Sequence, residues 1–154
     1  MAFRHATINT EKPNAVRASR LVKYGLLALV GASGVNLLVL TLGLTLLEYP
    51  SEFVGGTFGP LAAGPVIINS AVAAIGATVV YGLITRYAVR PNRTFVIIAG
   101  VVLVLSFAMF LAPDIAGAPL NVFVTLGLMH VTAAVVIVGV LLRAHHQSQY
   151  LSSR

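Results

Sequence analysis

The chain has 154 residues, of which 58% are hydrophobic and only 9% charged, and its formal net charge is +6. Soluble domains carry about 25% charged residues, so the composition excludes an ordinary water-soluble fold and favours a protein embedded in lipid. The absence of cysteine excludes disulfides and thiolate metal sites.

Charged residues are missing from four long stretches of the sequence: 24–47, 53–85, 94–113 and 115–142. A helix needs about 20 apolar residues to cross the hydrocarbon core of a bilayer, and each stretch is long enough. One charge at the centre of such a helix costs at least about 2.5–3.5 kcal/mol. We therefore predict an all-α, polytopic membrane protein with four transmembrane helices in an antiparallel bundle.

The second stretch is too long for one helix, and its first part is dense in glycine and proline, which interrupt helices. We predict an outer loop or a re-entrant turn at 55–64, and a second helix with Pro65 in its first turn. The predicted segments in chain order are an N-terminal tail (1–19), helices at about 22–47, 65–86, 94–112 and 120–143 within a transmembrane domain (20–143), and a C-terminal tail (144–154).

The basic residues divide the loops into two classes. All ten precede the first predicted helix, join the second to the third, or follow the fourth, whereas the other two loops hold the acids Glu48, Glu52 and Asp114. The positive-inside rule then predicts that both termini are cytoplasmic. Basic residues at the inner surface would contact anionic lipid head groups, so we expect the lipid bilayer as partner and no nucleic acid. We interpret the three acids as solvated loop residues and not as a cation site.

Small residues predict where the helices meet, because burial from water cannot drive association in lipid and close packing must. The predicted packing faces contain Gly25, Ala32, Asn36 and Gly43 in the first helix, and Asn69, Ala73 and Gly76, flanked by Ser70, Ala74 and Ala77, in the second.

Few polar residues lie inside the predicted helices, and His130 is the only ionisable one deep within them. Such residues are functional candidates, and histidine can carry protons or bind metal near neutral pH. We favour a neutral imidazole bonded to a partner such as Asn36, Asn69 or Ser106, because the helices offer no acidic partner for a proton relay. The candidate intramembrane polar cluster comprises His130, Asn36, Asn69, Ser70, Tyr81 and Ser106.

Three segments resemble a family of small prokaryotic four-helix membrane proteins that is classed as a domain of unknown function. They are Gly56-Thr57-Phe58-Gly59-Pro60-Leu61, Tyr81 through Arg93-Thr94-Phe95, and Leu128-Met129-His130-Val131. The resemblance covers the predicted helices and omits both tails. It implies a four-helix fold in a bacterial or archaeal cell membrane, and it implies no activity, cofactor or catalytic residue.

Three functions remain open. The favoured one is a non-enzymatic structural or accessory membrane subunit, without cofactor or metal, that pairs with itself or with a larger membrane complex. The second is a small oligomeric transporter or channel with a polar path through Asn36, Asn69 and His130. The third is a membrane oxidoreductase that binds haem or quinone between subunits, since the chain has no second histidine on a facing helix to complete a haem site.

Overall fold

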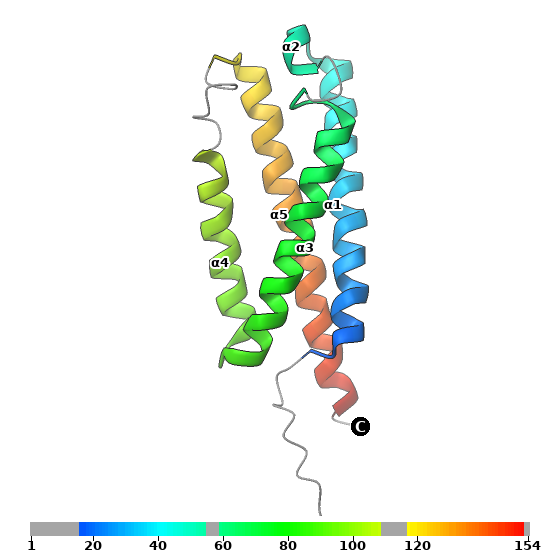
Figure 1. Cartoon of the computed structure of the whole chain (residues 1–154), viewed down its shortest axis with the longest axis vertical. Helices are drawn as coiled ribbons and strands as arrows, with labels where there is room; N and C mark the ends of the chain where they lie inside the picture. Colours follow the sequence, from blue (N-terminus) through cyan, green and yellow to red (C-terminus); the bar gives the residue numbers. More distant parts are fainter. Residues whose placement is uncertain (1–15, 55–58, 109–116, 153–154) are drawn as a thin grey trace, which may run out of the picture.

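The computed structural model describes residues 16–54, 59–108 and 117–152, and within these it describes side chains up to position 144. The described residues form helices and connecting turns, without a strand. The helices are α1 (Ala18–Leu46), α2 (Ser51–Val54), α3 (Ala63–Tyr87), α4 (Pro91–Ser106) and α5 (Leu120–Ser152) (Figure 1).

Three segments are long and apolar enough to cross a membrane: α1, α3 and the part of α5 from Leu120 to Ala144. Helix α4 is a shorter apolar helix. The prediction of an all-helical chain is therefore confirmed for the described residues, and three of the helices have the length and composition of membrane spans. Large apolar side chains such as Val30, Leu46 and Val104 are exposed on its surface, as expected where lipid is the solvent.

The ends of the helices differ in part from those predicted. Helix α3 begins at Ala63, which leaves Pro65 in its first turn as expected. Helix α5 continues to Ser152 through the segment assigned to a C-terminal tail, because no glycine or proline follows Arg143 to stop it. Four parts of the prediction lie outside the described residues: the end of the third helix at 112, Asp114, the N-terminal tail up to position 15, and the loop segment 55–58.

The loop before α3 contains a short helix, α2, that the sequence did not predict. Beyond it, the backbone N–H of Leu61 donates to the Phe53 carbonyl at 3.0 Å, which folds the chain back onto α2. The side chains of Phe53 and Leu61 are both buried. The described part of this glycine- and proline-rich loop therefore covers one end of the molecule.

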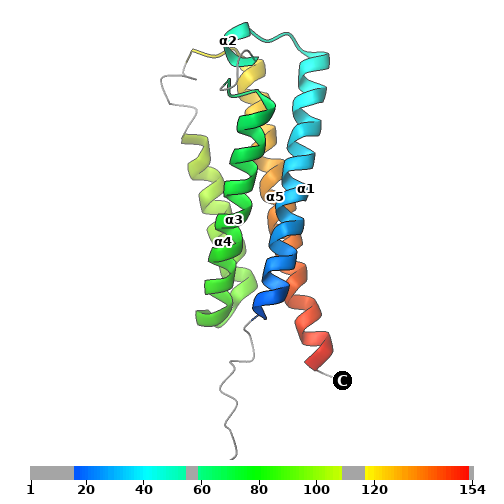
Figure 2. The ribbon, with the colours of Figure 1, turned by 45° about the vertical axis from the view of Figure 1, so that its right-hand side comes forward.

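Helix α1 packs against both α3 and α5 over much of its length (Figures 1 and 2). Small residues allow this close packing: Ala28 and Ala32 of α1 and Ala74 of α3 are fully buried. A Cβ atom added at Gly25 would lie only 2.8 Å from the side chain of Thr78 on α3. The predicted packing face of α1 is thus the one that meets its neighbours.

The packing face of α3 is rotated relative to the prediction. Ser70 and Ala74 turn toward α1 and are buried, whereas Asn69, Ala73 and Gly76 are exposed. The prediction that Asn69, Ala73 and Gly76 pack against another helix was wrong, because α4 contacts α3 less extensively than α1 does. Asn69, Ala73 and Gly76 instead line a cavity.

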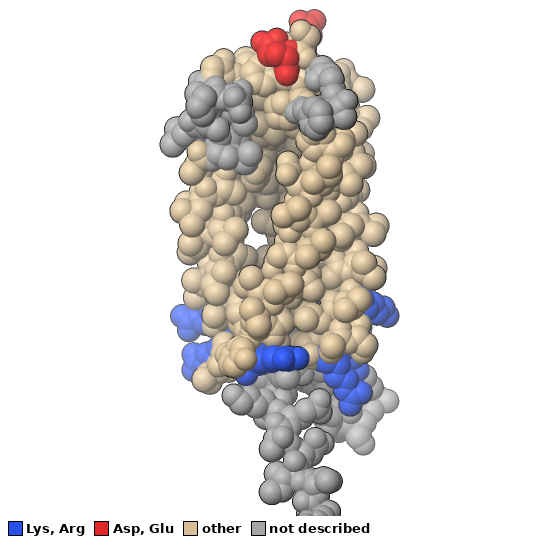
Figure 3. Space-filling view, viewed as in Figure 1, with Lys and Arg blue, Asp and Glu red and all other residues tan. Residues whose placement is uncertain are grey.

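Charged side chains gather at opposite ends of the molecule. Figure 3 shows Lys and Arg at the end where α1 begins, and acidic residues at the α2 end. On the face shown, the described surface between the two ends carries no Lys, Arg, Asp or Glu. The charge separation read from the loops is therefore present in three dimensions.

Candidate functional site

A hydrogen-bonded group of three side chains joins the three long helices near their middle. The Nδ2 of Asn36 on α1 donates to the Ser70 Oγ of α3 at 3.0 Å. The Thr132 hydroxyl of α5 lies 3.1 Å from the Asn36 Oδ1 and 2.9 Å from the Leu128 carbonyl, so these two acceptors share its one proton. Asn36 and Ser70 are buried. Both polar ends of the Asn36 amide are thus used to connect helices, which agrees with the structural interpretation of this asparagine.

His130 bonds within its own helix. Its Nδ1 lies 2.8 Å from the Leu126 carbonyl oxygen, one turn earlier in α5. Because a carbonyl can only accept, Nδ1 carries the proton in this hydrogen bond. The His130 ring also faces Phe107, with ring centroids 6.2 Å apart. Sequence reasoning did not predict this backbone bond, since it expected a side-chain partner such as Asn36, Asn69 or Ser106.

A cavity of about 530 Å³ lies between α3, α4 and α5. Its volume falls within the range of small-molecule sites, about 300–1,000 Å³. Five of the six residues in the candidate polar cluster line it: His130, Asn36, Asn69, Ser70 and Ser106. The structure therefore brings these five together, although their function stays a prediction.

Tyr81, the sixth residue, lies apart from the other five. Its hydroxyl donates to the Asn92 Oδ1 at 2.9 Å, and its ring packs on Phe95 with centroids 4.7 Å apart. The side chain is fully buried. These contacts tie α3 to the first turns of α4, so Tyr81 stabilises the end of the bundle where the two helices connect.

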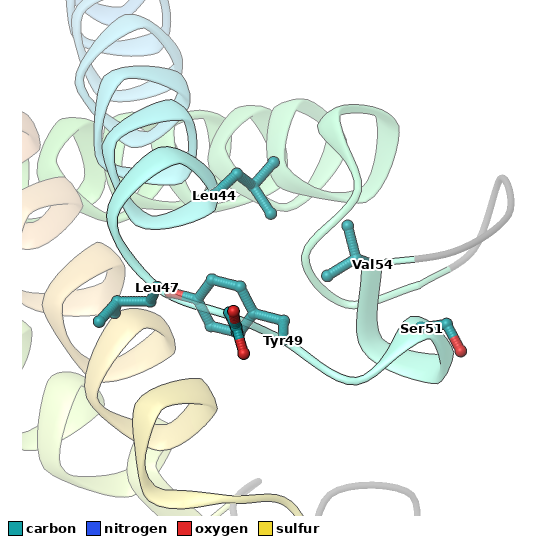
Figure 4. A pocket seen from close by; sticks show the side chains of 6 residues that line it. Leu44, Leu47, Tyr49, Ser51 and Val54 are labelled. Atoms are coloured by element: carbon teal, nitrogen blue, oxygen red, sulfur yellow. The ribbon is translucent and has the colours of Figure 1, made fainter.

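A second, open depression occurs at the α2 end of the molecule. Figure 4 shows Leu44, Tyr49 and Val54 around it. The Tyr49 hydroxyl makes a 2.7 Å hydrogen bond with the Thr125 Oγ1, and Asn121 Nδ2 donates to the backbone carbonyl of Glu48. These bonds attach the loop after α1 to the start of α5, so we interpret this region as structural.

A metal site needs several ligating side chains that lie close together. The described residues contain no group of three His, Cys, Asp or Glu side chains placed to hold a metal ion. Phe107, which contacts His130, was not singled out by sequence reasoning. The sequence spacing places Thr132 on one face of its helix with Thr125 and Gly139, and hydroxyl residues in apolar helices bond between helices.

Comparison with known proteins gives one match. A model for a family of unknown function, DUF6069, matches residues 16–147, which include the described residues that line the cavity. No curated protein matches the chain, and neither does any solved structure. The match covers most of the sequence, including α1 through α4 and most of α5. The chain therefore belongs to the DUF6069 family, whose function is unknown.

Proposed function

We propose that this chain is a multi-pass protein of the prokaryotic cell membrane, with four crossings in an antiparallel bundle. Helix α4 has 16 residues, or about 24 Å at 1.5 Å per residue, whereas the hydrocarbon core is about 30 Å thick. The sequence remains free of charge as far as Pro113. A fourth crossing is therefore supported by apolar residues on the C-terminal side of α4.

The proposed orientation has both termini in the cytoplasm. Its support is the charge separation along the bundle, with Arg and Lys at the end opposite α2. Basic residues near transmembrane ends remain on the cytoplasmic side during insertion. Glu48 and Glu52, which flank the start of α2, would then lie outside.

The proposed molecular role is that of a non-enzymatic structural or accessory membrane subunit. The observation that carries it is the Asn36–Ser70–Thr132 group, in which the buried polar atoms hold helices together. Hydrogen bonds between polar side chains of neighbouring helices stabilise helix association in the membrane. Here the central asparagine is committed to two helix-connecting bonds.

A small transporter is the second candidate, because His130 and Asn69 line one cavity. Flux measurements on vesicles containing the purified protein separate the two roles. The accessory role predicts ion and proton flux equal to that of empty vesicles, both for the unsubstituted chain and for His130→Ala. Flux above this background that is lost in His130→Ala would overturn the accessory role in favour of transport.

Native mass spectrometry of the gently solubilised protein tests whether the chain is a subunit of a complex, as the accessory role requires. We expect the chain in a complex of fixed composition, either with copies of itself or with other membrane proteins. A chain that remains monomeric in mild detergent and in nanodiscs, at membrane-like concentrations, would contradict a subunit role.

A further inference from the structure

The cavity between α3, α4 and α5 has no charged side chain among the described residues that line it. Most of these side chains are aliphatic or aromatic, including Val80, Phe95 and Ile98, and the described lining includes no Lys, Arg, Asp or Glu. A charged ligand would lose its hydration there without gaining a counter-charge, which is strongly unfavourable. The lining therefore selects a neutral, largely apolar occupant.

The polar groups of the cavity are confined to one part of its length. Along α3 the cavity reaches from Val66 to Val80, about 21 Å at 1.5 Å per residue. Asn69 lies near the α2 end of this span, and so does Ser106 at the far end of α4. Toward the basic end the lining becomes wholly apolar, with Val80 on α3 and Val138 on α5. An elongated molecule with one polar group and an apolar tail matches this distribution.

Asn69 lines the cavity without a hydrogen-bond partner among the described residues. Its side chain is exposed to the cavity, and the described part of the chain gives its amide no hydrogen bond. Ser106 donates its proton to the Leu103 carbonyl at 2.6 Å, which leaves its oxygen able to accept. An unpaired amide within the hydrocarbon region is costly, so a ligand that bonds to Asn69 recovers free energy on binding.

Access to the cavity is lateral. Helix α4 packs less extensively on α3 and α5 than α1 packs on either. On the face shown in Figure 3 the surface is hollowed at mid-height, between α4 and α3. A molecule dissolved in the bilayer could therefore enter between these helices without passing through water.

We propose that this cavity binds a neutral membrane lipid that carries a carbonyl or hydroxyl group. The polar group lies at Asn69 and Ser106, and the apolar tail extends toward Val80 and Phe95. Carbonyl-bearing lipids such as quinones and hydroxyl-bearing lipids such as isoprenoid alcohols share this chemistry. The site goes beyond the accessory role, and it requires only that the helices lie in the bilayer.

Two glycines provide a matched pair for the test. Gly76 lines the cavity and Gly100 does not, yet a Cβ at either position meets no atom within 4 Å. Gly76→Phe therefore fills the cavity, whereas Gly100→Phe adds the same ring at an open position outside it. Asn69→Leu removes the polar partner and keeps the side-chain volume. Circular dichroism and thermal unfolding in detergent establish that each variant is folded.

Binding is measured by native mass spectrometry with three probes of similar length: decyl-benzoquinone, farnesol and dodecane. We expect the quinone or the alcohol to bind, and dodecane to bind more weakly. Gly76→Phe should weaken binding about tenfold or more, and Asn69→Leu roughly tenfold, as expected for the loss of one buried hydrogen bond. Gly100→Phe should bind as the unsubstituted chain does. The probe that binds more tightly shows whether the natural ligand is a carbonyl-bearing lipid or a hydroxyl-bearing one.

Three results would overturn the proposal. One is that neither polar probe binds and that no neutral lipid is enriched in the purified protein relative to its fraction in the membrane. Another is that Gly76→Phe and Gly100→Phe reduce binding equally. The third is that Asn69→Leu, which keeps the cavity open, binds the polar probes unchanged. None of these results bears on oligomerisation or on the accessory role.

Discussion

Replacement of Asn36 by leucine tests whether the polar group in the middle of the bundle holds the helices together. The change removes two interhelical hydrogen bonds, of 3.0 and 3.1 Å, and roughly preserves side-chain volume. Such bonds in membrane proteins contribute about 0.6 kcal/mol each on average and about 1.7 at most. The loss of both would therefore lower the free energy of unfolding by about 1.2–3.4 kcal/mol.

The partners of Asn36 favour the lower part of this range. Ser70 also donates to the Val66 carbonyl at 2.7 Å, and the Thr132 hydroxyl lies 2.9 Å from the Leu128 carbonyl. Neither hydroxyl is left without a bond in Asn36→Leu, so no desolvation penalty is added. We expect a decrease of about 1–2 kcal/mol, measured by SDS titration in bicelles with circular dichroism as the readout.

Two further variants make this measurement specific. Thr41→Val removes an exposed hydroxyl that bonds only within α1, and should change stability by less than about 0.5 kcal/mol. A double-mutant cycle between Asn36→Leu and Ser70→Ala isolates the coupling across α1 and α3. Unchanged stability in Asn36→Leu, or an equal loss in Thr41→Val, would refute the assignment of Asn36 as a helix-connecting residue.

Two other substitutions, each with a control, probe the packing of the helices. Gly25→Val should lower the free energy of unfolding by about 1–3 kcal/mol in the same titration, because its Cβ would lie 2.8 Å from an α3 side chain. A Cβ at Gly34 meets no atom within 4 Å, so Gly34→Val should be tolerated. Equal effects of the two substitutions would contradict the close approach of α1 to α3. Tyr81→Phe removes the 2.9 Å bond to Asn92 and should cost about 0.5–1.5 kcal/mol, while Tyr87→Phe, at a side chain 77% exposed, should leave stability unchanged. A Tyr81→Phe protein as stable as the Tyr87→Phe protein would show that this bond does not hold α4.

The long helices could be predicted from the sequence because a helix that faces water carries a polar stripe, and the uncharged, membrane-length stretches of this chain leave no room for one. The gathering of Asn36, Asn69, Ser106 and His130 around one space was also predictable in outline. Polar residues in apolar helices tend to face one another or a shared interior and not lipid. Their individual hydrogen bonds were not predictable, since Asn36 has several hydroxyls within reach of the same helices.

The rotation of α3 could not be read from its sequence. Asn69 and Ser70 begin adjacent rows of small residues, about 100° apart around the helix at 3.6 residues per turn. Which row packs against α1 depends on the shape of the partner and on where α4 lies. The position of Tyr81 was equally hidden, because its partner Asn92 belongs to the next helix and is recognised only once the turn between them is formed.

Side-selective labelling of single cysteines tests the proposed four-crossing topology most directly, and the chain has no native cysteine to interfere. Exposed positions near each helix end are available at Ser19, Ser51, Val89 and Gly117. With a membrane-impermeant maleimide on intact cells, we predict labelling of Ser51→Cys and Gly117→Cys only. Ser19→Cys and Val89→Cys should react only after the membrane is opened. Protection of Gly117→Cys in intact cells, or labelling of Val89→Cys there, would contradict four crossings with both termini inside.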